Sequence, residues 1–372
     1  MQRDTGSDSL VEGKEESLHK MLEPFDPAYV TLFAELGERV SDAGLIEGLP
    51  PGGTFELRSV NGREYWYHRA YNRATGKDTV RYVGPAAAAL SARIERHRSL
   101  QPDIRGRRQL VSTLKRAGFP APDTFTGEVI AAMSRAGLFR LRACVVGTVA
   151  YQCYSALLGV WLPATAMRTE DVDVAQFHGI AVGIGEAAQP LLDALREVDA
   201  SFAPVPSLKS PVLSNALRNA RGYRVELLTP HQGAEERGDD LVPLPSLPGL
   251  GAQPLRFLDY LLFGEVPTVV LHGPGIAVNV PAPERYAVHK LIVATRRSGA
   301  GRLKAAKDIA QAGSLIQALV QTRQADLLRD AWDDAWSRGP HWRQALTRGR
   351  ERLEPAAAGV LSEVLGSATS LR

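Results

Sequence analysis

The feature of this sequence that most constrains its fold is a run without charged residues, 143–167, placed just before an acidic segment. The run is long enough for the ~20 apolar residues of a membrane-spanning helix. It is interrupted by glycine, proline and polar residues, namely Gly147-Thr148, Gln152, Ser155, Gly159 and Pro163. We therefore expect a buried strand over 141–146, a tight turn, and a buried helix over 149–159, and no membrane span.

The acidic segment that follows reads Asp171-Val172-Asp173-Val174. Successive side chains of a strand point to opposite faces, so Asp171 and Asp173 project together while the valines face the core. Two carboxylates on one face repel each other, and a divalent cation would neutralise them. Mg²⁺ prefers oxygen ligands of this kind, so the pair is a candidate metal site.

Two further features support a phosphate-handling site. The Gly147-Thr148 turn precedes a helix, and a helix N-terminus offers backbone N–H groups to phosphate. Glu226 lies in a short apolar strand over 223–228, where an unpaired carboxylate is costly to bury. It is therefore a candidate third acid of the site, although pairing with Arg221 or Arg224 is an alternative.

This order of motifs resembles the polymerase-β-like nucleotidyltransferase superfamily, in which a strand ends in Gly-Ser or Gly-Thr and the next strand carries Asp-x-Asp. A helix with Lys290, followed by Arg297 and by Lys304-x-x-Lys307-Asp308, is similar to the second domain of the abortive-infection-type members. The resemblance covers roughly 140–320. The sequence departs from many members in having Thr148 in place of serine and a longer gap before Asp171, which an insertion around 161–168 would explain.

The resemblance implies an enzyme that moves a nucleoside monophosphate from a nucleoside triphosphate to an acceptor hydroxyl. Asp171, Asp173 and Glu226 would then hold Mg²⁺ (or Mn²⁺), and Glu226 would help to deprotonate the hydroxyl. Gly147, Thr148, Lys290 and Arg297 are the expected nucleotide-binding residues. A solvated basic face is the alternative for Lys290 and Arg297, and a structural ion pair is expected for Lys307-Asp308.

The hydrophobic pattern divides the chain into four regions and predicts an α/β (α+β) fold. We expect a flexible tail over 1–20 and an accessory region over 21–120, made of a helix, a three-stranded meander over 54–83 with an Asn61-Gly62 turn, and a basic helical stretch. A nucleotidyltransferase core with a mixed sheet follows over 121–282. It includes a long loop over 229–255 and a hairpin over 268–280. A helical domain over 283–372 completes the chain.

The acceptor is left open by the sequence. RNA fits the arginine-rich stretch 93–116, which would contact phosphates, although a solvated helix surface fits equally. Tyr65, Trp66, Tyr67 and Tyr71 would either stack on bases or pack within the sheet. A small antibiotic-type molecule, a protein hydroxyl, and a non-catalytic module that binds nucleotide or RNA are the alternatives.

The remaining composition sets only broad limits. Cys144 and Cys153 are the two cysteines, which is too few for a disulfide framework, so we expect buried structural thiols. The first twenty residues lack the apolar segment of a signal peptide, which predicts a cytoplasmic protein. The formal net charge of +3 is too small to indicate a partner.

Overall fold

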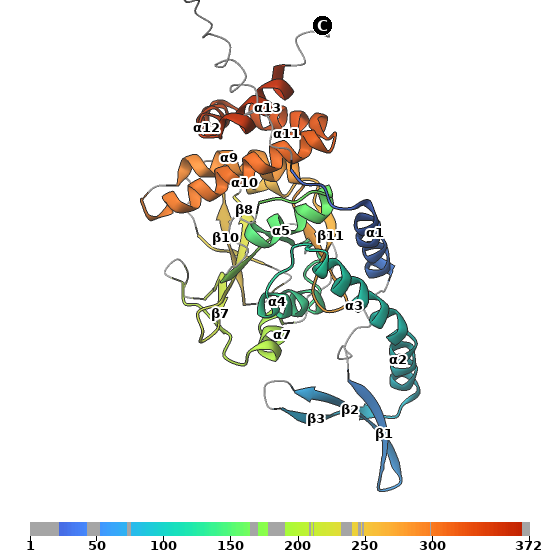
Figure 1. Cartoon of the computed structure of the whole chain (residues 1–372). Helices are drawn as coiled ribbons and strands as arrows, with labels where there is room; N and C mark the ends of the chain where they lie inside the picture. Colours follow the sequence, from blue (N-terminus) through green and yellow to red (C-terminus); the bar gives the residue numbers. More distant parts are fainter. Residues whose placement is uncertain are drawn as a thin grey trace, which may run out of the picture.

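A computed structural model of the chain describes residues 22–42, 53–72, 76–163, 170–177, 190–207, 210, 212–231, 240–244, 247, 249–297 and 299–366 (Figure 1). The expected tail over 1–20 lies outside these residues, as does most of the expected insertion around 161–168. In the described part of the chain, no helix is both long and apolar enough to span a membrane.

A mixed nine-stranded sheet forms the centre of the described structure. Its order is β11-β12-β4-β5-β8-β10-β9, and β7 pairs with the first half of β8 and with β6. Strand β4 is antiparallel to β5, whereas β5 is parallel to β8, which confirms the expected mixed sheet. The strands are β4 Cys144–Val146, β5 Asp171–Ala175, β6 Ala203–Pro204, β7 Ala216–Arg218, β8 Arg224–Pro230, β9 Val242–Pro243, β10 Gly251–Leu255, β11 Val266–Val270 and β12 Ile276–Val280.

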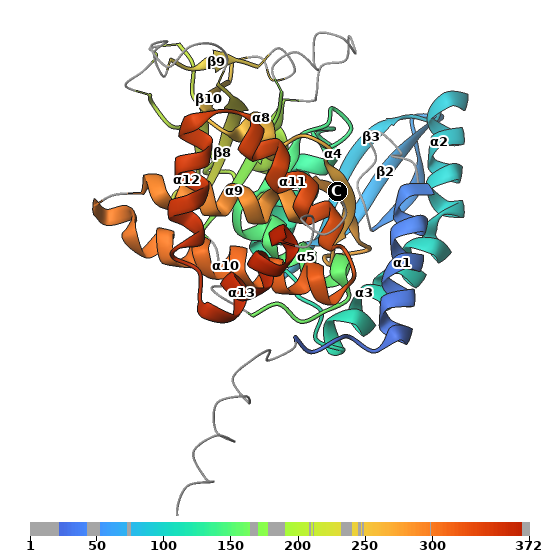
Figure 2. The same ribbon diagram turned by 90° about the horizontal axis from the view of Figure 1, so that it is seen from above.

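Helices pack on this sheet and join it to the C-terminal region. Helix α5 (Gly147–Leu158) packs on β4, β5 and β11, and α4 (Thr124–Arg135) packs on β12 and on α7 (Leu191–Val198). The C-terminal helices lie together above the sheet (Figures 1 and 2). They are α9 Pro283–Arg296, α10 Arg302–Gln321, α11 Ala325–Ser337, α12 Pro340–Arg350 and α13 Pro355–Gly366, with α8 Leu258–Leu261 and the short η1 Gly299–Gly301 beside them. Their buried side chains share one hydrophobic cluster with the sheet.

The accessory region contains the expected helix and meander. Helix α1 spans Pro27–Asp42, and β1 Thr54–Val60, β2 Arg63–Asn72 and β3 Lys77–Pro85 form a separate antiparallel sheet. Asn61 and Gly62 both have positive φ values, 50° and 74°, as a two-residue hairpin turn requires. The face of this sheet that carries Trp66 packs on helix α2 (Ala88–Ser99), so Trp66 is buried and is not available to stack on a base.

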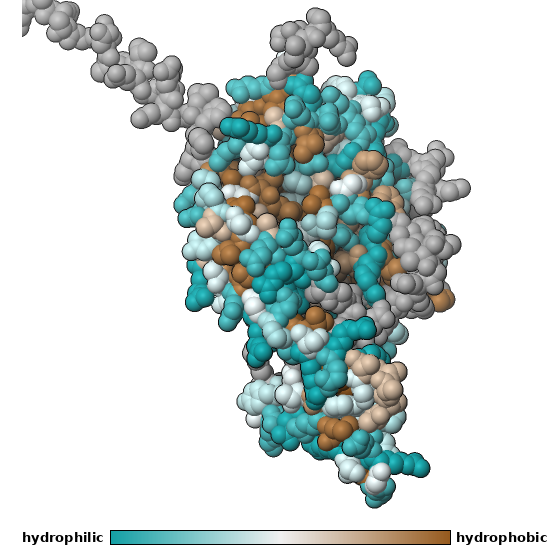
Figure 3. Space-filling view, turned by 90° about the vertical axis from the view of Figure 1, so that its right-hand side faces the viewer, coloured by the Kyte–Doolittle hydropathy of each residue, from teal (hydrophilic) through white to brown (hydrophobic). Residues whose placement is uncertain are grey.

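The basic stretch 93–116 is divided between α2 and a second helix, α3 (Gln101–Arg116), with Pro102 in the first turn of α3. A proline fits there because the first N–H groups of a helix have no intrahelical partner. The stretch is partly structural. The Arg107 side chain is buried and donates from Nε to Asp103, 2.7 Å away, and Arg39 of α1 binds the same carboxylate at 2.7 Å. In Figure 3, the narrow lower end of the molecule carries many hydrophilic residues together with a small apolar patch.

The expected loop over 229–255 is wrong in part. Strand β10 adds to the sheet beside β8, and the leucines at 241, 244 and 250 are buried. The segment Gly-Ala-Gln-Pro-Leu lacks β-branched and aromatic residues, so its strand propensity is low. Packing against β8 outweighs this propensity. Residues 232–239, 245–246 and 248 lie outside the described part of the chain.

The shared carboxylate of Asp103 predicts that Arg107 stabilises the accessory region. Arg107→Ala should lower the free energy of unfolding by about 1–3 kcal/mol, because a buried, charge-assisted hydrogen bond is lost. The matched control is Arg108→Ala, since Arg108 is the exposed neighbour on the same helix. Urea unfolding of the two variants measures the difference, and equal stabilities would contradict the structural role of Arg107.

Candidate active site

The turn between β4 and α5 is shaped by Gly147. Its φ is +66°, and a Cβ at this position would lie 2.9 Å from Oδ2 of Asp173. A side chain is therefore excluded both by the backbone conformation and by the neighbouring carboxylate. The sequence predicted a tight Gly-Thr turn here, and the structure places that turn directly against the acidic strand.

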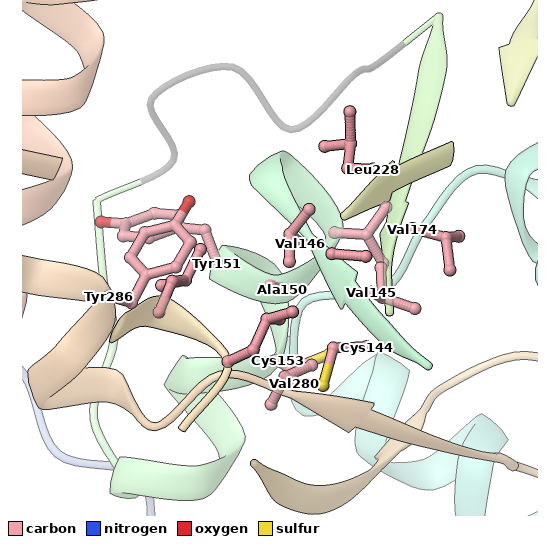
Figure 4. Packing of buried hydrophobic residues seen from close by; sticks show 14 of the residues in the cluster. Cys144, Val145, Val146, Ala150, Tyr151, Cys153, Val174, Leu228, Val280 and Tyr286 are labelled. Carbon is pink, nitrogen blue, oxygen red and sulfur yellow. The ribbon is translucent and has the colours of Figure 1, made fainter. Parts of the chain in front are cut away.

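The packing beneath this turn is dense and apolar. Val145 and Val146 of β4 lie beside Ala150 of α5, and the rings of Tyr151 and Tyr286 are stacked 6.3 Å apart (Figure 4). The two cysteines are free and buried, and burial raises the pKa of each thiol to about 12. They are therefore structural thiols, as predicted.

The three predicted acids face the same side of the sheet. Asp173 of β5 is directly in register with Glu226 of β8, and Asp171 lies two residues before Asp173. Val172 and Val174 are buried on the other face, at 1% and 3% exposure. In-register residues of neighbouring strands share a face, so the carboxylates are brought together by strand pairing.

The main electrostatic effect of this arrangement is a change in the pKa of Asp173. Burial, with the charges of Asp171 and Glu226, raises the pKa of Asp173 to about 7. Glu226 also forms an ion pair with Arg224, whose Nη2 is 2.9 Å from Oε1 of Glu226. Arg221, the other candidate partner of Glu226, pairs with Asp199. Across the described residues, no three His, Cys, Asp or Glu side chains are gathered tightly enough to form a preassembled metal site.

The predicted cations of the C-terminal helices converge on one buried carboxylate. Asp308 is 2% exposed and binds Lys290 through Oδ1 at 2.6 Å and Arg297 through Oδ2 at 2.5 Å. The two cations therefore bind the same carboxylate, although α9 ends at Arg296 and Arg297 lies just beyond it. The partners of Asp308 are these two residues rather than its neighbour Lys307, because successive helical residues point about 100° apart.

Lys307 is the lysine that contacts the turn. Its Nζ donates to Oγ1 of Thr148 at 3.0 Å. Burial, followed by the charge of Lys290, lowers the pKa of Lys307. The sequence assigned nucleotide binding to Lys290 and missed Lys307, because only the fold brings α10 to the N-terminus of α5.

Tyr286 is a second residue that the sequence analysis missed. Its hydroxyl lies 2.9 Å from the Gly147 carbonyl oxygen and 3.2 Å from Oε1 of Gln311. The side chain is buried, so it links the turn to helices α9 and α10. Tyr286 lies four residues before Lys290, so the two share a face of the predicted helix. This spacing was the signal in the sequence that Tyr286 could lie near the site.

Comparison with known proteins identifies the family to which the chain belongs. A family profile described as nucleotidyltransferase matches residues 124–337, more than half of the chain. The chain is therefore a member of this nucleotidyltransferase family. The matched region contains every predicted site residue from Gly147 to Arg297.

One solved structure is also similar. It is the crystal structure of an antigenic nucleotidyltransferase-like protein from Paracoccidioides brasiliensis, with 18% identity and a TM-score of 0.29. The match covers 64% of this chain and 97% of that chain. No curated protein is similar enough to count as a relative.

The raised pKa of Asp173 predicts a pH-dependent effect on stability. The ordinary carboxyl pKa near 4 applies to the unfolded chain, so raising the pH from about 4 to 7 deprotonates the unfolded state first and destabilises the fold. In EDTA at pH 8, Asp173→Asn should raise the free energy of unfolding by about 1–2 kcal/mol, with little change at pH 4. Thermal melts at both pH values measure this. The control is Asp330→Asn on α11, where the side chain is exposed; an unchanged or lower stability of Asp173→Asn at pH 8 would refute the prediction.

Proposed function

We propose that this protein is a metal-dependent nucleotidyltransferase of the cytoplasm, which transfers a nucleoside monophosphate from a nucleoside triphosphate to an acceptor hydroxyl. The observation that carries the proposal is the register of Asp173 with Glu226, together with the contact of Asp173 with the Gly147 turn. The N-terminus of α5 therefore lies beside three carboxylates, and a helix N-terminus is suited to binding phosphate. The family match supports the general reaction class.

The donor set of the site suits Mg²⁺ or Mn²⁺. Asp171, Asp173 and Glu226 offer only carboxylate oxygens, the ligands that these ions prefer. Burial raises the pKa of Asp173, and the negative charges of Asp171 and Glu226 raise it further; a divalent cation would offset the repulsion among these carboxylates. A bound ion would supply charge neutralisation to the triphosphate and the developing oxyanion.

The residues around the carboxylates have complementary roles in this proposal. The N-terminus of α5 and the Thr148 hydroxyl bind the triphosphate, and Lys307 adds a positive charge beside Thr148. The acceptor oxygen forms a bond to the α-phosphorus while the bond from that phosphorus to the bridging oxygen breaks. Pyrophosphate leaves with the electron pair of that bond, and the proton of the hydroxyl passes to Glu226 and then to water.

The direct test is incubation with each labelled nucleoside triphosphate, Mg²⁺ and total RNA, followed by detection of labelled products. The variants Asp171→Asn, Asp173→Asn and Glu226→Gln should each lower the transfer rate by at least about 10³-fold. The carboxylates would hold the metal ion whose positive charge neutralises the transition state. Asp330→Asn serves as the control for a carboxylate outside the site. Transfer at the wild-type rate by either Asp171→Asn or Asp173→Asn would remove the basis of the proposal.

A pair of lysine variants separates nucleotide binding from structural support. Lys307→Ala should raise the KM for the nucleoside triphosphate about tenfold with a nearly unchanged melting temperature. Lys290→Ala should lower the free energy of unfolding by about 1–3 kcal/mol, because the buried Asp308 loses one of its two cations. Steady-state kinetics and thermal melts of the two variants check this. The opposite pattern, with a KM effect at Lys290 alone, would instead support the nucleotide-binding role that the sequence predicts for Lys290.

A further inference from the structure

The strand register places two arginines on the catalytic face of the sheet. Arg224 of β8 is directly in register with Asp171 of β5, and Arg218 of β7 is directly in register with Arg224. One row therefore runs Asp171, Arg224, Arg218 across three neighbouring strands. The next row runs Asp173, Glu226, Ala216. Since paired residues share a face, both arginines project on the same side as the three carboxylates.

The two arginines form a like-charge pair that strand pairing alone does not favour. Residues directly opposite in an antiparallel ladder have Cβ atoms about 5 Å apart, and like charges there are destabilising. Glu226 neutralises Arg224 in part, through the 2.9 Å ion pair. Arg218 is exposed, and it makes no side-chain ion pair or hydrogen bond to the residues that the structure describes. An anion between the two guanidinium groups would relieve the repulsion, and guanidinium groups bind phosphate in a bidentate manner.

The order of strands places Arg218 at the far side of the carboxylates from the Gly147-Thr148 turn. The Gly147-Thr148 turn follows β4, the carboxylates lie on β5 and β8, and the arginines lie on β8 and β7. Lys307 is on the turn side, where it contacts Thr148. A triphosphate bound at the turn therefore leaves Arg218 one strand beyond Glu226, with Arg224 on the same strand as Glu226. That side is where the attacking hydroxyl must approach, because Glu226 receives its proton.

We infer that Arg218 and Arg224 bind a phosphate of the acceptor, and that the acceptor is the 3′ end of a single-stranded RNA. This inference rests on the proposed function and specifies its acceptor. The phosphate that precedes the terminal nucleoside would occupy the arginine pair while the terminal hydroxyl lies beside Glu226. A cationic aminoglycoside would instead meet two positive charges as it entered, so the pair opposes the antibiotic-type acceptor.

Binding is measured first, without nucleotide or metal, so that it does not depend on transfer. The full chain is titrated into a 5′-fluorescein-labelled 12-nucleotide RNA, and anisotropy is followed at several salt concentrations. Arg218→Ala should raise the Kd about tenfold and make the salt slope shallower by about 0.7, the change expected for one lost contact to a single strand. Arg348→Ala on α12 is the matched control, because it also removes one exposed arginine but lies outside the sheet. Its Kd should stay within twofold of wild type.

Transfer kinetics then test the position of the contact. Arg218→Ala should raise the KM for the RNA about tenfold and leave the KM for the nucleoside triphosphate within twofold. Arg218→Lys, which keeps the charge but not the planar fork, should give an intermediate KM. The melting temperature of Arg218→Ala should be equal to or slightly above that of wild type, since the side chain is exposed and one of two like charges is removed.

The inference and the proposed function fail in different ways. Equal RNA affinities of Arg218→Ala and Arg348→Ala, or no RNA binding by the wild-type protein, overturn the inference. Transfer to an aminoglycoside that improves in Arg218→Ala also overturns it, and leaves the proposed function standing. RNA binding that depends on Arg218, without transfer to any acceptor, supports the anion site and removes the proposed function.

Discussion

The close approach of Asp173 to Gly147 is the contact on which the rest of the site depends. A β-carbon at position 147 would lie 2.9 Å from Oδ2 of Asp173, so glycine allows the turn and the acidic strand to approach each other this closely. The antiparallel pairing of β4 with β5 fixes this approach, with Val146 opposite Asp173. The parallel pairing of β5 with β8 then brings Glu226 to the same face. Burial of Asp173, together with the charges of Asp171 and Glu226, then raises the pKa of Asp173.

The C-terminal helices complete the site rather than merely covering the sheet. Tyr286 of α9 reaches the Gly147 carbonyl oxygen, and Lys307 of α10 reaches Thr148. Asp308 holds Lys290 and Arg297 together in the junction between these helices. Because a buried carboxylate with two cations is costly to break, this junction fixes the position of α10 and therefore that of Lys307. The helical region and the sheet share one hydrophobic cluster, so the helices that carry Tyr286 and Lys307 are packed directly against the sheet.

The sequence predicted the local part of this arrangement well. Alternation alone placed Asp171 and Asp173 on one face, and the Asn61-Gly62 turn predicted the hairpin that the structure contains. The pairing of Asp173 with Glu226 was anticipated through the family resemblance. It does not follow from the sequence pattern, because the two residues lie on strands that are far apart along the chain.

The parts that could not be predicted depend on non-local packing. The partners of Asp308 and the contact of Lys307 with Thr148 arise from helices that meet across the fold. Arg107 is buried although it belongs to a basic stretch of the sequence. Its burial depends on where α1 packs, which the charge pattern does not reveal. Strand β10 has a composition typical of a loop and forms only because β8 offers it a partner. The arginine row at Arg218 and Arg224 likewise becomes visible only through strand register.

A crystal structure of the protein with Mn²⁺ and a nucleoside triphosphate that cannot be cleaved at its α-phosphate would test directly whether the carboxylates hold a metal ion beside the Gly147-Thr148 turn. Anomalous scattering locates the manganese independently of the protein coordinates. We predict an anomalous peak about 2.2 Å from carboxylate oxygens of Asp171 and Asp173, with the triphosphate at the Gly147-Thr148 turn. A manganese peak elsewhere, or a triphosphate bound away from the turn, would contradict it.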